Sequence, residues 1–403
     1  MKSTSRLAAL LPSDRPLHLA GARFVSARPR TGRLPVLLSD PSSVIIPVDV
    51  GDPRAVNSAF RMSFDLPDDL LTPIHHMTKP VTLDAVELDR FRGVTLLQRG
   101  QEDLIAVASG TTGTDPDTDY RLDTRFQISS ISKQFTATAL LLLADRGVLS
   151  VEDPVHRWID GCPSSWDSMT VHHLLTHTAG LGHWWHIPEL DLTKPMAADE
   201  ELRLFQESPL LSPPGDSYSY SSPGYVVIAR IVERAAGQPY ASFLTREMFE
   251  PLAMTATFAG NGTCEYGLAV GHNFGAAVTS FELDTVGMGA GDIWSVAGDM
   301  ARWDRALASG EILSHESRQA MLKIHAAVED DDGLVRTRGY GYGWYIGSVT
   351  GGHPVIYHTG DNVGFLSFNA WFPEDAVRLI VLTNEETTDL QAIIGQVVMT
   401  AFP

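Results

Sequence analysis

The sequence has little cysteine and a deficit of positive charge. Its 403 residues include two cysteines, Cys162 and Cys264, which form neither a CxxC pair nor a ligand cluster, so no disulfide framework or zinc knuckle is predicted. Lys and Arg number 30 against 49 Asp and Glu, for a formal net charge of −19. A field of this sign repels phosphate backbones and anionic membrane surfaces. We therefore expect neither nucleic acid nor a membrane as a partner.

Long hydrophobic runs are also missing. The longest apolar stretch, residues 137–144, falls well short of the roughly 18 residues that a membrane-spanning helix needs. Near the start, Lys2 and Arg6 precede a short apolar stretch that Pro12 ends before it reaches the length of a signal-peptide core. We expect a soluble, cytoplasmic protein whose cysteines stay reduced.

The composition is that of a folded protein with more than one packed unit. Hydrophobic residues make up 44% and charged residues 20%, close to globular averages. A chain of this length exceeds what one core usually serves. Residues 1–88 hold short apolar runs cut by prolines, and we predict an N-terminal extension of strands and turns with an unknown role. Residues 89–403 are predicted to form the main domain.

The sequence of the main domain predicts strands, then helices, then strands. Extended runs at 93–98 and 104–108 predict a hairpin, and a helical lobe is expected at about 145–300. Helices are predicted at about 131–146, 169–177, 198–207, 223–237 and 296–308, and extended runs at 338–348, 353–358, 364–372 and 377–383, after an acidic loop at 329–333 and before a final helix at 387–400. The predicted fold class is α/β of the α+β kind, an antiparallel sheet flanked by helices with the helical lobe inserted.

A serine and a lysine stand three residues apart at the start of the first predicted helix. Ser130 and Lys133 therefore meet on one face of that helix. A lysine activates a serine hydroxyl if burial and nearby positive charge depress its pKa, and the helix amino terminus favours the developing alkoxide. An isolated S-x-x-K more often means an N-cap serine and a surface lysine. The surrounding sequence decides between these interpretations.

Several ordered blocks resemble the serine β-lactamase and penicillin-binding protein superfamily, particularly its class C β-lactamase and esterase branch. The nucleophile segment is similar to Phe126-Gln-Ile-Ser-Ser-Ile-Ser-Lys-Gln-Phe-Thr-Ala137. The other blocks are residues 171–181, the Y-x-N-like loop at 214–225, Pro251-Leu-Ala-Met254, residues 289–300, and His358-Thr-Gly360 in place of K-T-G. The resemblance covers about residues 90–403, and it implies a β-lactamase/transpeptidase-like fold with a Ser130 nucleophile and a Lys133 base.

The resemblance assigns the tyrosine of the Y-x-N motif to Tyr220. It implies that this phenol shuttles a proton between Ser130 and the leaving group, and a phenol near an ammonium can have a lowered pKa. Ser222 stands where the family usually has asparagine, so recognition of a β-lactam side-chain amide is in doubt.

The K-T-G motif of the family differs here at its first residue. His358 replaces the lysine, and a histidine is mostly neutral at pH 7, whereas that lysine supplies a fixed charge for a substrate carboxylate. By resemblance, Ser222, His358, Thr359 and Gly360 are candidate substrate-binding residues. The backbone N–H groups of Ser130 and Asp361 would form the oxyanion hole, and glycine at 360 lets the strand lie close to the substrate.

Other candidates carry less weight. Trp184 and Trp185 could form a wall of the substrate cleft, although aromatic pairs more often simply pack. His173 and His177, with His183 and His186 nearby, could bind a metal, but there is no H-E-x-x-H motif, and no metal site is predicted. There is no G-x-S-x-G, so the α/β-hydrolase elbow is absent. Residues 287–291 lack the spacing of a dinucleotide loop, and no cofactor is expected. A sequon at residues 261–263 matters only in a secretory context.

These features predict a serine acyl hydrolase, most simply an esterase, that works through a Ser130 acyl-enzyme. Three alternatives stay open: a transacylase that passes the acyl group to an amine or alcohol, a D-amino-acid peptidase or amidase, and a catalytically silent binding relative. The expected partners are a small-molecule acyl donor and water or an amine or alcohol acceptor. A homo-oligomer is also possible.

Overall fold

The computed structural model describes residues 91–111, 118–190, 196–260, 267–278 and 287–402, together with four short strands before residue 50. The chain divides into two units, Met1–Lys79 and Pro80–Pro403. The sequon at 261–263 and Cys264 lie outside the described residues, whereas Cys162 is a free thiol.

The N-terminal unit contains a four-stranded antiparallel sheet in the order β1-β2-β3-β4. Its strands are β1 (Pro16–Leu19), β2 (Ala22–Val25), β3 (Arg33–Leu38) and β4 (Ile46–Asp49). Strands were expected in this proline-interrupted stretch. The role of residues 1–88 stays a prediction.

The second unit is built around an eight-stranded antiparallel sheet in the order β12-β13-β14-β15-β16-β17-β5-β6. Its strands are β5 (Gly93–Arg99), β6 (Glu102–Ser109), β12 (Ala326–Asp331), β13 (Val335–Tyr340), β14 (Tyr345–Val349), β15 (Pro354–Asn362), β16 (Phe365–Phe372) and β17 (Val377–Thr383). The first hairpin pairs with the last strand, from Val377 opposite Arg99 to Thr383 opposite Gly93. This register brings the two ends of the unit together in one sheet.

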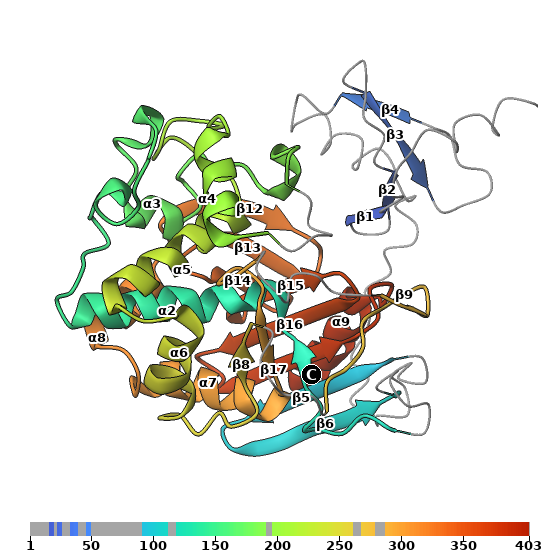
Figure 1. The fold of residues 1–403 in the computed structure, drawn as a ribbon. Helices are drawn as coiled ribbons and strands as arrows, with labels where there is room; N and C mark the ends of the chain where they lie inside the picture. Colours follow the sequence, from blue (N-terminus) through green and yellow to red (C-terminus); the bar gives the residue numbers. More distant parts are fainter. Residues whose placement is uncertain are drawn as a thin grey trace, which may run out of the picture. The chain divides into compact units, whose positions relative to one another are not determined.

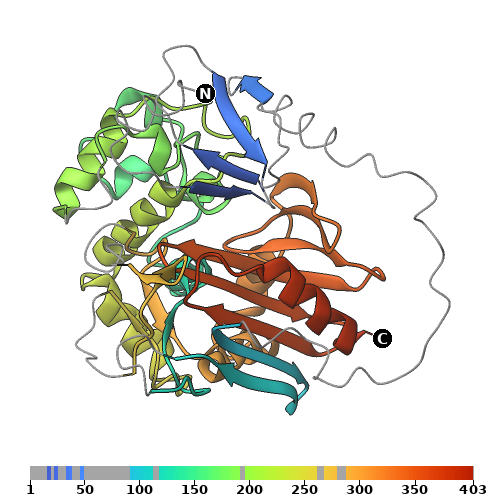
Figure 2. The ribbon, with the colours of Figure 1, turned by 90° about the vertical axis from the view of Figure 1, so that its right-hand side faces the viewer.

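Helices cover both faces of this sheet (Figures 1 and 2). Helix α9 (Leu390–Ala401) packs Val397 and Val398 against one face, where Leu379 and Val381 of β17 point. The intervening residues of β17, such as Ile380, point to the other face and join the core beneath the remaining helices. Alternation along a strand buried on both sides produces these two cores.

The remaining helices and short strands come mostly from the stretch between β6 and β12. They are η4 (Ser129–Ile131), α2 (Ser132–Asp145), η5 (Val155–Arg157), η6 (Ser164–Trp166), α3 (Val171–Leu175), η7 (Trp184–His186), α4 (Ala198–Glu207), α5 (Ser222–Ala236), α6 (Tyr240–Leu244), the π-helical η8 (Thr245–Phe249), α7 (Ala297–Ser309) and α8 (His315–Met321), with strands β7 (Phe126–Gln127), β8 (Phe258–Ala259), β9 (His272–Asn273), β10 (Ala276–Ala277) and β11 (Ile293–Ser295). The predicted helices at 198–207 and 296–308 match α4 and α7 closely. The α+β architecture with an inserted helical lobe is confirmed.

Two expectations for the chain after residue 325 were wrong. The acidic stretch 329–333 was expected to be a loop, yet Glu329, Asp330 and Asp331 lie in β12. The run at 338–348 was expected to be one strand, but it folds back as β13 and β14. Gly343 lies in that turn with φ +78°, and a Cβ there would stand 2.8 Å from the backbone oxygen of Lys133. Only glycine therefore lets the turn sit on the helix that carries the lysine.

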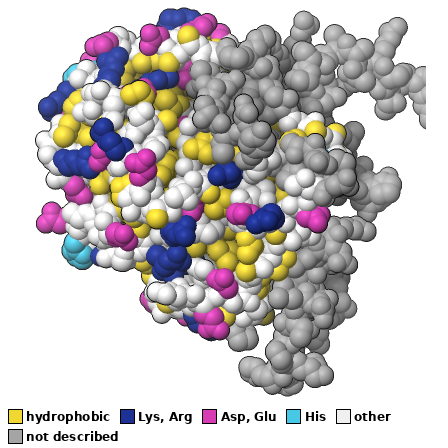
Figure 3. All heavy atoms as spheres, turned by 60° about the horizontal axis from the view of Figure 1, so that its bottom comes forward, with side chains coloured by type: hydrophobic (Ala, Val, Ile, Leu, Met, Phe, Trp, Pro, Cys, Tyr) yellow, Lys and Arg dark blue, Asp and Glu magenta, His cyan; other side chains and the backbone are white. Residues whose placement is uncertain are grey.

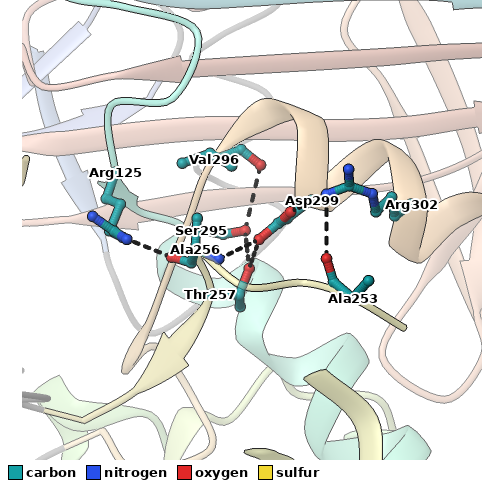
Figure 4. A network of polar contacts seen from close by, with 8 residues as sticks. All are labelled: Arg125, Ala253, Ala256, Thr257, Ser295, Val296, Asp299 and Arg302. Atoms are coloured by element: carbon teal, nitrogen blue, oxygen red, sulfur yellow. Dashed lines mark hydrogen bonds and ion pairs between the residues drawn. The ribbon is translucent and has the colours of Figure 1, made fainter. Parts of the chain in front are cut away.

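A buried carboxylate joins helix α7 to the loop before strand β8 (Figure 4). Asp299 accepts hydrogen bonds from the backbone N–H of Ala256 at 2.9 Å and from the Thr257 hydroxyl at 2.9 Å. Its other oxygen forms an ion pair of 2.7 Å with Arg302. Both carboxylate oxygens are thus occupied, as a buried charge requires.

The surface of the described residues is mixed in character. Figure 3 shows a face on which basic and acidic side chains are interspersed among apolar ones. Within the described part of the chain, none of the helices has the length and apolar character needed to span a bilayer.

Candidate active site

The nucleophile candidate lies at the junction between a 3-10 turn and a buried helix. Ser129 has φ +53°, a left-handed conformation that costs energy for a residue with a Cβ. Ser130 follows in η4 and is partly exposed, whereas Lys133 in the first turn of α2 is fully buried. The Nζ atom of Lys133 lies 2.9 Å from Oγ of Ser130. The contact expected from the three-residue spacing is therefore present.

A second contact holds the lysine in place. Lys133 Nζ donates a hydrogen bond of 2.7 Å to the backbone oxygen of Ala290. The next residue, Gly291, offers its backbone oxygen to the Asn362 side chain at 3.0 Å, and Asn362 ends strand β15. This segment thereby joins the lysine to the sheet. The sequence interpretation missed Asn362, because nothing near it in the chain marks this contact.

Tyr220 completes a group of three polar side chains. Its ring centroid lies 5.0 Å from Lys133 Nζ, and hydrogen bonding by the Ser130 and Ser222 side chains acts to lower the pKa of its hydroxyl. The lowered pKa that was expected from the nearby lysine is wrong. Burial is the main cause that raises the pKa of Tyr220 well above its ordinary value, and Tyr345 adds to the rise. The phenol is therefore protonated at neutral pH and can act as an acid.

Strand β15 approaches the nucleophile closely at one glycine. A Cβ on Gly360 would stand 2.4 Å from the backbone oxygen of Ile128 and 2.9 Å from Cβ of Ser129. Ser367 of β16 donates a hydrogen bond of 2.8 Å to the same Ile128 oxygen. This packing places the residue after Gly360, Asp361, beside η4, where the expected oxyanion hole requires it.

His358 is enclosed, which differs from its expected role as a substrate-binding residue. Its side chain is 1% exposed, Nδ1 donates to the backbone oxygen of Thr359 at 2.6 Å, and Nε2 accepts from the Tyr340 hydroxyl at 3.1 Å. Both ring nitrogens are occupied, so neither is left for a substrate. Burial, assisted by Lys133, lowers the pKa of His358 to about 3. The imidazole is thus uncharged at neutral pH, as the sequence suggested.

The exposed side chains of β15 lie on one face of the strand. Thr359 and Asp361 are exposed and alternate with buried neighbours. Partial dehydration of Asp361, with a smaller contribution from Glu386, raises the pKa of this carboxyl to about 7 although part of it reaches solvent. Strand β15 therefore contributes the carboxyl group of Asp361 to the site, and its His358 contributes no positive charge.

The two tryptophans have different surroundings. The Trp184 ring lies 6.0 Å from that of Phe205 and packs against the hydrophobic core. Trp185 is 65% exposed and stacks on His183 with ring centroids 4.0 Å apart. His183 in turn stacks on Tyr220 at 5.6 Å. Trp185 is therefore the better candidate for a wall of the cleft.

The histidines that were weighed as metal ligands are used in other ways. His177 accepts a hydrogen bond from the Ser221 N–H at 3.1 Å, and His173 accepts one from the Thr170 N–H at 3.2 Å. His186 accepts from the His183 N–H at 3.1 Å. Among the described residues, no three His, Cys, Asp or Glu side chains are grouped so as to hold a metal ion.

Comparisons with known proteins agree with this geometry. The Beta-lactamase family model matches residues 85–397. Penicillin-binding protein 4* of Bacillus subtilis is 27% identical over 320 residues, which cover 74% of this chain and 69% of that protein. Esterase EstB of Burkholderia gladioli is 33% identical over 183 residues, which cover 40% of this chain and 45% of the esterase.

Solved structures share the fold. A penicillin-binding protein from Bacillus halodurans superimposes with a TM-score of 0.68 at 23% identity, over 78% of this chain and 98% of that one. A D-amino acid amidase from Ochrobactrum anthropi gives 0.67 at 23% identity, over 78% of this chain and 95% of that one. With the match over most of its length, the chain belongs to the Beta-lactamase family and is a serine hydrolase of that family.

Proposed function

We propose that this protein is an esterase-type hydrolase that forms an acyl-enzyme on Ser130. The observation that carries the proposal is the contact of 2.9 Å between Lys133 Nζ and Ser130 Oγ, with the Tyr220 hydroxyl bonded to the same serine. The arrangement provides a nucleophile, a base and an acid within one hydrogen-bonded group.

The chemistry follows from the placement of these groups. Once Lys133 has given up its own proton, its amine takes the Ser130 proton while Oγ forms a bond to the carbonyl carbon of the ester. The backbone N–H groups of Ser130 and Asp361 stabilise the oxyanion. The bond to the leaving alcohol then breaks, and its oxygen takes the proton of Tyr220. The Lys133 ammonium returns a proton to the phenolate, and water repeats the sequence to release the acid.

The charges of the site favour uncharged acyl donors. His358 is buried and neutral, so β15 offers no fixed cation to a substrate carboxylate. Asp361 instead presents a carboxyl group on the exposed face of the same strand. A carboxylate-bearing donor such as a β-lactam therefore loses an ion pair and meets a like charge. The partial match to an esterase is consistent with this preference.

Intact-mass measurement tests the proposal and separates it from its alternatives. The enzyme is mixed with activated esters, thioesters, D-amino-acid amides and β-lactams, and the mass of the protein is followed with and without added amines. We expect rapid acylation by small esters and decay that amines do not accelerate. Decay that needs an amine, with a new amide as product, would instead identify a transacylase. If no donor adds mass to the folded enzyme, the proposal fails.

A further inference from the structure

A histidine outside the Ser130–Lys133–Tyr220 group is held in one orientation beside it. His183 precedes η7, and its Nδ1 atom accepts a hydrogen bond of 2.7 Å from the backbone N–H of Trp184. Its ring lies between two others, stacked on Trp185 at 5° and on Tyr220 at 22°. Only 9% of the residue is exposed. The imidazole can therefore neither flip nor turn without losing these contacts.

The hydrogen bond at Nδ1 determines where the ring carries its proton. A backbone N–H can only donate, so Nδ1 is the unprotonated nitrogen. Burial, assisted by Lys133, lowers the pKa of His183 to about 3, which leaves the ring neutral. The single ring proton is therefore on Nε2, which lies 3.3 Å from the Ser222 hydroxyl oxygen. His183 donates in this pair and Ser222 accepts.

The direction of the His183–Ser222 hydrogen bond determines which way the Ser222 hydroxyl points. Because the Ser222 oxygen accepts from His183, its own hydrogen is left to point elsewhere. Ser222 is 4% exposed, and hydrogen bonding by its side chain acts to lower the pKa of Tyr220, as a donor to the phenol oxygen does. The Ser222 hydroxyl therefore donates to the Tyr220 oxygen. That oxygen in turn directs its hydrogen toward Ser130, its other hydrogen-bond partner.

We infer that His183 is a positioning residue of this active site, which acts through Ser222 to aim the Tyr220 proton at the reacting centre. When the leaving oxygen takes that proton, the phenolate left behind accepts the Ser222 hydrogen bond. His183 and Ser222 keep their own protons throughout. The inference rests on the proposed acyl transfer, because it describes how the acid of that reaction is held.

This assignment also gives Ser222 a role other than substrate recognition. Where the family usually has an asparagine amide, the Ser222 hydroxyl accepts a hydrogen bond from His183 and donates one to Tyr220. The pair of Ser222 and His183 would supply a hydrogen bond to Tyr220. A lone serine could rotate its hydroxyl away from Tyr220, and the histidine prevents this rotation.

Leaving-group dependence tests the inference, because only a poor leaving group needs the Tyr220 proton. An alkyl ester releases an alkoxide that must be protonated, whereas p-nitrophenolate departs without protonation. We expect His183→Phe and Ser222→Ala each to lower kcat/KM, which reports the acylation step, by about tenfold for an alkyl ester and by less than about threefold for the matched p-nitrophenyl ester. His183→Gln, which keeps an N–H near the position of Nε2, should recover most of the lost rate.

A double variant and a matched control complete the experiment. The double variant combines His183→Phe with Ser222→Ala. If His183 acts through Ser222, kcat/KM of the double variant for the alkyl ester should be no lower than that of the slower single variant. His325, a half-buried histidine stacked on Tyr342 at 4.3 Å, serves as the control, and His325→Phe should leave the ratio of the two esters unchanged.

The outcomes separate this inference from the proposed function. A wild-type enzyme that no ester acylates overturns the proposed function itself. A wild-type enzyme that is acylated, with His183→Phe and Ser222→Ala slowing both esters equally or neither, overturns the positioning role alone. Should His183→Phe not fold, His183→Gln and Ser222→Ala still decide the question.

Discussion

Two buried polar networks in this protein use their hydrogen-bonding groups differently. Around Asp299, both carboxylate oxygens are occupied by partners that only hold them in place (Figure 4). Around Ser130, the hydroxyl has two polar neighbours, Lys133 and Tyr220, that can each give or take a proton. The first network is built to stay fixed, and the second is built to move protons.

The second network also carries energetic costs that the first avoids. Ser129 adopts φ +53°, and neither its hydroxyl nor His177 Nε2 has a hydrogen-bond partner within the described ranges. A buried polar atom left unpaired costs about 1–3 kcal/mol. The packing of the helix and strands around Ser130 must offset this loss in the free energy of folding. Strain of this kind is typical of functional sites.

The largest effect should follow from loss of the nucleophile. Ser130→Ala removes the only atom proposed to become acylated, so kcat should fall by about 10⁴ or more. A fluorophosphonate followed by peptide mapping should label Ser130 alone in the wild type. A label on Ser129, Ser132 or Ser222 would show that another serine is the nucleophile. The contrast between the Ser130 and Asp299 networks would then not hold.

Loss of either proton carrier should be nearly as severe. Lys133→Ala and Tyr220→Phe should each reduce kcat by about 10²–10⁴, and the two losses should not add, because both groups serve one proton path. Circular dichroism checks that each variant is folded. If Tyr220→Phe retains more than about half of wild-type kcat/KM, its acid role is excluded.

The structural network should respond in stability and not in rate. Asp299→Ala leaves the Ala256 N–H and the Thr257 hydroxyl without their acceptor, whereas the exposed Arg302 is solvated by water, so the free energy of unfolding should fall by about 1–3 kcal/mol. Urea unfolding gives this value, and kcat per folded molecule should change by less than about twofold. A large loss of kcat in the folded fraction would show that the two networks are coupled.

The smallest effect concerns charge selection at Asp361. With a pKa raised to about 7, this carboxyl is neutral below that pH and negative above it. Glu386 and the Tyr220 phenol are the titratable groups that affect or face it. The ratio of kcat/KM for a neutral ester to that for an anionic ester should therefore rise about fivefold as the pH passes 7. Asp361→Asn should make this ratio independent of pH, and an unchanged pH profile in that variant would contradict the assignment.

Local patterns predicted the fold well where sequence neighbours determine structure. The apolar runs of β5, β16 and β17 and the amphipathic pattern of α4 lie within single elements. Strand β12 was missed because acidic residues have low strand propensity, although charged residues suit a strand at a sheet edge such as this one. The β13–β14 turn was missed because the structural requirement for its glycine comes from Lys133, which is remote in the chain.

The site was predictable only as far as spacing and resemblance reach. One helical turn brings Lys133 to Ser130, so the sequence was sufficient for that contact. The raised pKa of Tyr220 depends on burial and on Tyr345, which come from distant segments. The link between His183 and Ser222 likewise joins the residue before η7 to the first residue of α5, and 39 positions of sequence separate the two. Such electrostatic and tautomeric details appear only when the elements have packed.

The pairing of β5 with β17 has a consequence for biosynthesis. On the ribosome, the segment that carries Ser130 emerges long before β15, which carries Asp361 and the close approach at Gly360. The nascent chain therefore holds its nucleophile without the proposed oxyanion donor until nearly all of the sequence is made. We therefore expect the proposed reactive centre to form only after the last strand has closed the sheet. Before that closure, an unfinished chain should react only slowly with acyl donors.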